Sequence, residues 1–180
     1  MGQVLINALV NAALIGPPAV AFSMLFGILR FPNFAIGGYI TVGAFAVYAF
    51  NVTLGLPLVL ATLLGMVVTG ALVWLSDEIV FKPMREHSPI TLLIVSIALT
   101  LILEQSVRLF WGADVRGFDL PLTRPMKFAG MRITVEQVWI IGLALAVASL
   151  THAILRYTRI GKAMRATSDN FMLAQVRGIN

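Results

Sequence analysis

The chain has 180 residues, of which 59% are hydrophobic and only 12% are charged, and its mean hydropathy is +0.92. A soluble domain carries about 25% charged residues, so this composition excludes a water-soluble globule and indicates an integral membrane protein. The net charge of +5 is then explained as loop charge that sets membrane topology. The chain has no cysteine, which excludes a disulfide framework.

Long apolar segments divide the chain into predicted spans. A helix that crosses a bilayer needs about 20 predominantly apolar residues, and the segments that approach this length are 4–29, 34–50, 57–80, 89–110 and 135–156. The first contains Gly16, Pro17 and Pro18, and two missing backbone donors predict a kinked or broken helix there. The expected fold class is an all-α integral membrane protein with about five transmembrane helices, the first one broken at Gly-Pro-Pro.

The distribution of Lys and Arg predicts an orientation, because five spans place the two termini on opposite sides of the membrane. One side carries Arg30, Lys82, Arg85, Arg156, Arg159, Lys162, Arg165 and Arg177. The other side carries Arg116, Arg124, Lys127 and Arg132. Since cytoplasmic loops are richer in Lys and Arg, we expect the N-terminus outside and residues 158–180 in the cytoplasm.

Residues 158–180 form a basic segment that is too polar to cross a membrane. One helix face is predicted by the spacing of Ile160, Ala163, Met164, Thr167, Phe171 and Ala174. Lys162, Arg165 and Asp169 lie away from that face, and Asp169 or Asn170 could also cap a fresh short helix that stops at Gly178. Periodicity alone favours a helix that lies on anionic lipid headgroups.

The stretch GKAMRATSDNFMLAQVRGIN resembles the cytoplasmic EAA loop of permease subunits of bacterial ABC importers, and more narrowly that of the branched-chain amino acid permease family. Residues 161–166 match the opening of the family's pattern, and Ala174 with residues 178–180 match its end. Met172 and Leu173 stand where the general motif has Glu-Ala. The stretches LRFPNFAIGGYITVGAF, with Ile36 in place of the family's His, and ILEQSVRLFWGADVRGFDLP also resemble family segments, so the resemblance covers nearly the whole chain.

This resemblance implies a permease subunit that translocates branched-chain amino acids or a related small solute such as urea, an amide or an aromatic acid. It implies no enzyme activity and no cofactor bound by this chain; consistently, no G-x-x-x-x-G-K-[ST] motif occurs, so a partner would use the ATP. The implied partners are ABC ATPase subunits, a second permease subunit in a heterodimer, a periplasmic or extracellular solute-binding protein and the lipid bilayer, with no nucleic acid. The implied location is the bacterial inner membrane. Family members continue past this loop with further spans, so we expect a fragment or a truncated subunit.

Two groups of candidate site residues follow. The resemblance implies that the ATPase would be contacted by Gly161, Lys162, Arg165, Phe171, Met172, Ala174 and Gly178. The candidates for the substrate path are Gly16, Pro17, Asn33, Gly37, Gly38, Glu104 and Arg108. Each of these has a structural alternative: Asn33 as a helix cap, the glycines as close packing positions, and Glu104 with Arg108 as a local pair at i, i+4 spacing.

Other functional classes receive less support from the sequence. A secondary transporter or channel that needs no ATPase is the alternative function; it predicts internal inverted repeats and buried ionisable relays, and no clear repeat is evident. A membrane-embedded enzyme would need a nucleophile with a base, and no serine motif is evident. His152 has no second histidine nearby and the chain has no cysteine, so no metal site is expected.

Overall fold

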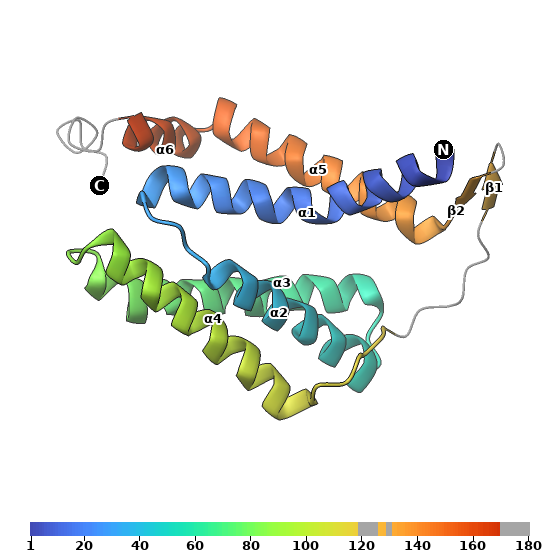
Figure 1. The fold of residues 1–180 in the computed structure, drawn as a ribbon, viewed down its shortest axis with the longest axis horizontal. Helices are drawn as coiled ribbons and strands as arrows, with labels where there is room; N and C mark the ends of the chain where they lie inside the picture. Colours follow the sequence, from blue (N-terminus) through green and yellow to red (C-terminus); the bar gives the residue numbers. More distant parts are fainter. Residues whose placement is uncertain (119–125, 129–130, 170–180) are drawn as a thin grey trace. The chain divides into compact units, whose positions relative to one another are not determined.

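The computed structural model describes residues 1–118, 126–128 and 131–169 (Figure 1). The long helices are α1 (Gly2–Leu29), α2 (Ala35–Tyr48), α3 (Leu58–Ser76), α4 (Pro89–Trp111) and α5 (Val135–Tyr157). The π-helical turn η1 (Ala49–Thr53) extends α2, and η2 (Asp77–Phe81) and η3 (Lys82–Met84) extend α3. With these extensions, five helices within the described residues are long and apolar enough to cross a membrane, which confirms the expected fold class. A shorter helix, α6 (Arg159–Asp169), follows α5.

The structure corrects one expected detail, the break in the first helix. Helix α1 continues through Pro17 and Pro18 without interruption. Each proline removes one backbone donor, but leaving the helix in a bilayer would expose many more unsatisfied backbone groups. Continuing the helix is therefore the less costly arrangement.

The chain forms two compact units. The terminal unit comprises Met1–Arg30 and Leu122–Asn180, and the central unit comprises Phe31–Pro121. In the terminal unit, α1 lies along α5, and α6 lies beside the end of α5 and also contacts α1 (Figure 1). In the central unit, α2 packs against both α3 and α4.

Glycines allow the close packing of α2 in the central unit. A Cβ atom on Gly38 would lie 3.0 Å from the Leu103 side chain and 3.1 Å from the Thr100 Cα on α4. A Cβ on Gly65 of α3 would collide with Val47 of α2. Helices in lipid associate through such small residues, because backbones can then approach closely. The core of this unit therefore lies where α2 meets its two neighbours.

Side chains define the ends of several helices. Ser88 accepts a hydrogen bond from the Thr91 amide at the start of α4, directly before Pro89. Thr134 and Gln137 form a capping box at the start of α5. Before α5, β1 (Met126–Phe128) pairs antiparallel with β2 (Met131–Ile133). The sequence did not predict this pairing, since three-residue strands are too short to show a clear alternation.

Two ion pairs fix the end of the long third span. Arg85 donates to Asp77 over 2.7 Å, and Lys82 pairs with Glu78 one helical turn away. All four side chains are about half exposed. These charges mark the point at which the third helix leaves the apolar region.

Candidate functional site

The segment before α2 is held by polar side chains rather than by helical hydrogen bonds. Asn33 is 6% exposed, and its Oδ1 accepts from the Ala35 amide over 3.0 Å. The Phe34 amide donates to the Ser96 Oγ over 3.1 Å, and the Thr100 Oγ1 donates to the Phe34 carbonyl over 2.8 Å. Asn33 therefore accepts from the first residue of α2, although the N-cap position itself is Phe34, and a role of Asn33 in the substrate path stays a prediction.

Ser96 and Thr100 explain how irregular backbone can lie beside the middle of α4. Ser96 is fully buried and lies about 10 Å from the start of α4, at 1.5 Å of rise per residue. Non-helical backbone at membrane depth is tolerated only where protein groups satisfy it. The two hydroxyl groups, one turn apart on α4, supply those partners to Phe34.

The α2–α4 contact continues toward the far end of α4 and opens into a cavity. A Cβ on Gly37 would make only ordinary contact with Thr100, at 3.8 Å, whereas a Cβ on Gly38 would be crowded by Leu103 and Thr100 at 3.0–3.1 Å. Helix packing therefore explains Gly38, and substrate approach at either glycine stays a prediction. Beyond them, a cavity of about 300 Å³ is lined by Thr41, Phe45, Glu104, Val107, Arg108 and Asp114, among others.

The α2–α4 cavity brings Glu104 and Arg108 together but does not pair them. Glu104 is half-buried and Arg108 is exposed. In the described part of the chain, neither side chain makes an ion pair with the other or with a third residue. Asp114, at the same cavity, makes none there either. The sequence suggested a local pair at this spacing, and the structure instead directs both groups to the cavity lining.

Aromatic rings form one wall beside the α2–α4 cavity. The Phe45 ring lies 5.7 Å from the Trp111 ring and 6.2 Å from the Tyr48 ring, measured between centroids. Tyr48 in turn contacts Phe118 at 6.4 Å. The cavity therefore combines charged groups from α4 and the residues after it with an apolar wall from α2.

Gly16 and Pro17 belong to the terminal unit and have different surroundings. They line an apolar hollow of about 250 Å³ between α1 and α5, opposite Ala144 and Ala148. No charged side chain lines this hollow. A Cβ on Gly16 would meet nothing within 4 Å. Apart from the Thr151 hydroxyl, the described lining is apolar, so the structure offers mainly apolar contact here.

The α5–α6 corner is a tight turn built around Thr158. The Thr158 Oγ1 donates to the Ile154 carbonyl over 2.6 Å and accepts from the Gly161 amide over 3.0 Å. One side chain therefore satisfies the end of α5 and the start of α6. Gly161 is buried, and a Cβ there would collide with the backbone carbonyl oxygens of Ile154 and Leu155. Only glycine fits this corner without moving α6.

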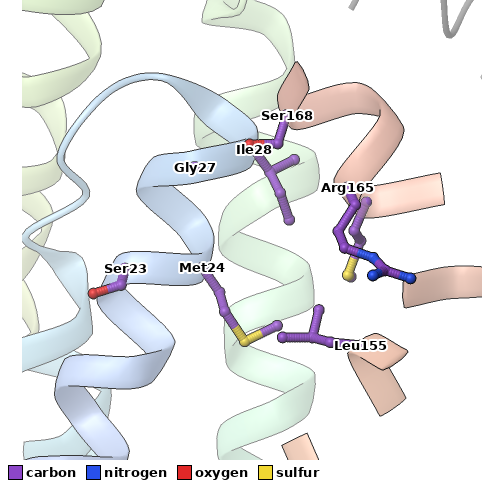
Figure 2. A pocket seen from close by; sticks show the side chains of 8 residues that line it. Ser23, Met24, Gly27, Ile28, Leu155, Arg165 and Ser168 are labelled. Atoms are coloured by element: carbon purple, nitrogen blue, oxygen red, sulfur yellow. The ribbon is translucent and has the colours of Figure 1, made fainter. Parts of the chain in front are cut away.

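Contacts with α1 fix the other end of α6. The Arg30 guanidinium donates to the Ser168 carbonyl over 3.4 Å, and a Cβ on Gly27 would lie 3.5 Å from the Ser168 Oγ. A small pocket of about 170 Å³ lies between α1, α5 and α6, where Met24 and Leu155 point toward one another (Figure 2). Helix α6 is thus held against both neighbours within the terminal unit.

The predicted ATPase-coupling residues divide into three groups. Lys162 and Arg165 are exposed on α6, whereas Gly161 is buried against α5. Phe171, Met172, Ala174 and Gly178 lie outside the described residues. Sequence reasoning missed Thr158, Ser96 and Thr100. Their signals were a threonine directly before the GKAMR stretch and two hydroxyl residues one turn apart in an apolar span.

Comparison with known proteins decides the family. A family model described as "Branched-chain amino acid transport system / permease component" matches residues 4–180. The chain belongs to this family. This match confirms the resemblance found in the sequence. Membership of a permease family also agrees with the helical architecture.

Curated relatives agree with the family match. The chain is 28% identical over 179 residues to the high-affinity branched-chain amino acid transport system permease protein LivH of Escherichia coli (strain K12), covering 90% of this chain and 57% of the relative. It is also 28% identical to LivH of Salmonella typhimurium, and 25% identical over 193 residues to BraD of Pseudomonas aeruginosa, with 62% of BraD covered. The chain therefore spans about three fifths of the length of these relatives. No solved structure matches it.

Proposed function

We propose that this chain is a membrane-spanning permease component of an ABC importer that translocates branched-chain amino acids or a chemically related small solute. The family match over residues 4–180 is the observation on which the proposal rests. The relatives are named as branched-chain amino acid permeases, which supports the solute class. The five apolar spans supply the membrane path that a permease needs.

The proposed orientation places the N-terminus outside and α6 in the cytoplasm. The side that holds Arg30, Lys82, Arg85 and α6 carries more Lys and Arg, which favours the cytoplasm. Helix α6 then presents Lys162 and Arg165 to the cytoplasm. We place this orientation in the inner membrane, which is the location that the family suggests for a multi-pass protein.

The proposed coupling passes through α6 to a separate ATPase. The exposed face of α6 would dock on the ATPase, with Lys162 and Arg165 at the rim and Phe171, Met172, Ala174 and Gly178 completing the contact. Because Thr158 and Gly161 fix α6 against α5, and Arg30 ties it to α1, a displacement of α6 would move both spans. ATP hydrolysis on the partner would in this way shift the bundle between outward-open and inward-open states.

The remaining partners follow from the same proposal. A second permease subunit would complete the path as a heterodimer, and a periplasmic or extracellular binding protein would deliver the solute. This chain would bind no cofactor and perform no catalysis, because the ATPase would hold and hydrolyse the nucleotide.

Co-purification tests this proposal. The tagged permease that contains this chain should retain its ATPase, and the double variant Arg165→Glu with Gly178→Asp should lose at least nine tenths of it. The control is Arg116→Glu, which makes the same change as Arg165→Glu but in the loop after α4, and it should retain the ATPase. If the double variant retains as much ATPase as the control, α6 is not the docking element.

The alternative function is a secondary transporter or channel. The charged Glu104 and Arg108 in a membrane-spanning helix favour it, because ion-coupled transporters use intramembrane ionisable groups. Solute uptake that persists without ATP and stops when the ion gradient is dissipated would select this alternative. Uptake that requires the ATPase would exclude it.

A further inference from the structure

We infer that the α2–α4 cavity binds the charged ends of a zwitterionic amino acid, with Glu104 receiving the ammonium group and Arg108 the carboxylate. The inference rests on the proposed function, since it deepens the solute class to a specific set of contacts. It uses the described residues of the central unit alone.

The first argument is that Glu104 and Arg108 line the cavity without forming an ion pair among the described residues. Glu104 lies seven residues before the last residue of α4, about 10 Å into the span. A charged group at such depth is costly, and ionisable groups inside a membrane protein mark substrate and ion pathways. Glu104 has no ion-pair partner among the described residues, although Arg108 stands one turn away on the same helix. A ligand with both charges would satisfy the two groups together.

The second argument is the combination of groups around the cavity. The Thr41 Oγ1 donates its proton to the Gly37 carbonyl over 3.1 Å, so its lone pairs remain available to accept from an ammonium group. Phe45 and the buried Val107 supply the apolar surface that an aliphatic side chain would contact. A few polar groups that fix orientation beside an apolar wall are typical of small-molecule sites.

The third argument is size. The cavity holds about 300 Å³, which is the lower end of the range of about 300–1,000 Å³ that ligand sites occupy. A small amino acid therefore fits better than a peptide. Asp114 adds a second carboxylate to the lining, so the cavity carries more negative than positive groups and attracts the ammonium end.

The fourth argument is the rigidity of the cavity walls. Gly38 packs directly on Thr100 and Leu103, and the Phe34 backbone is bonded to Ser96 and Thr100. These contacts fix the register of α2 on α4 below the cavity. Thr41 on α2 and Glu104 on α4 are therefore held on facing helices without any ligand present.

Protection of a single cysteine tests the inference. The chain contains no cysteine, so Ala113→Cys, at the exposed rim of the cavity, gives one reporter for a maleimide in membranes that contain the full permease. Leucine, leucinamide and 4-methylpentanoate serve as probes, since the second lacks the carboxylate and the third lacks the amine. Leucine should slow the modification at a concentration about 10- to 100-fold lower than either analogue, as expected for one lost charge-assisted hydrogen bond.

Variants assign each charge. Glu104→Gln should abolish the preference for leucine over 4-methylpentanoate but keep the preference over leucinamide. Arg108→Gln should do the reverse. Gln105→Ala, on the same turn but outside the cavity lining, should leave both preferences unchanged.

The outcomes separate this inference from the proposed function. If leucine does not slow modification, or if both preferences survive Glu104→Gln and Arg108→Gln, the cavity is not the site, whatever the ATPase association shows. If the protection pattern is as expected while no ATPase co-purifies, the cavity binds amino acids and only the coupling to an ATPase is wrong.

Discussion

Helices α2 and α5 are both apolar and both contain glycine, yet only α2 is packed as a core element. Ala35, Gly38 and Tyr39 of α2 are buried, whereas the structure assigns no buried residue to α5. The difference lies in what faces each glycine: Gly38 meets α4, while a Cβ on Gly142 of α5 would meet nothing within 4 Å. A glycine in an apolar helix thus marks a packing position only when a neighbouring helix lies against it.

The two regions to which we assign function are also held in place by different kinds of contact. The α2–α4 region is fixed by glycine packing and by hydroxyl groups that hold backbone atoms. The α5–α6 corner is fixed by one threonine, one glycine and the contact from Arg30. We expect changes in the first region to affect the stability of the bundle, and changes in the second to affect the placement of α6.

The largest expected effect is that of Gly38→Leu. The new side chain would have to displace the Thr100 backbone, and such overpacking costs about 1–3 kcal/mol or more. The matched control, Gly142→Leu, places the same side chain in open space, where replacing glycine in a helix favours stability by up to about 1 kcal/mol. Thermal unfolding in detergent measures both. Equal Tm values for the two variants would contradict the packing assigned to α2.

A smaller effect on stability is expected for Gly161→Ala, with a larger effect on coupling. The added Cβ collides with two carbonyl oxygens of α5, so α6 must pivot away from its position. We expect the Tm to fall by only a few degrees and the co-purified ATPase to fall severalfold. Gly142→Ala is the control and should retain the ATPase. Full retention by Gly161→Ala would mean that the corner does not position α6.

Next comes Ser96→Ala. The variant removes the hydroxyl that accepts from the Phe34 amide, and losing such a buried hydrogen bond costs about 1–3 kcal/mol. Ser106→Ala removes a hydroxyl from the same helix that bonds only to the Ile102 carbonyl one turn before it, and should change stability by less than about 0.5 kcal/mol. Chemical or thermal unfolding of the two variants measures their free energies of unfolding. If Ser106→Ala lowers stability as much as Ser96→Ala, the role assigned to Ser96 is refuted.

The smallest expected effect is that of Asp77→Asn. The pair with Arg85 is about half exposed, and exposed ion pairs contribute about 0.2–1 kcal/mol. The difference between Asp77→Asn and the unchanged protein should shrink further at high salt, because salt screens exposed charges. A loss above 2 kcal/mol would show that this pair is part of the core.

The predictable part of the fold follows from composition and helix boundaries. The spans could be predicted because each needs about 20 apolar residues, and Ser88 with Pro89 marks the start of α4 in the sequence itself. The effect of Pro17 and Pro18 was misjudged, since local propensity counts the lost hydrogen bonds but not the cost of leaving a helix in lipid.

The sites were less predictable, because they depend on the register between helices. The sequence places Glu104 and Arg108 one turn apart, but only the tertiary structure shows that they face a cavity shared with Thr41 rather than each other. Likewise, Thr158 is one of several threonines in the sequence. Its role appears only when α6 turns back against the end of α5.

The central claim is the proposed topology, in which α6 lies in the cytoplasm and the loop after α4 lies outside. Single cysteines at Lys162 and at the fully exposed Val115 test it with a membrane-impermeant maleimide on intact cells. The account predicts that Val115→Cys is labelled in intact cells and that Lys162→Cys is labelled only after the membrane is permeabilised. Labelling of Lys162→Cys in intact cells would contradict it.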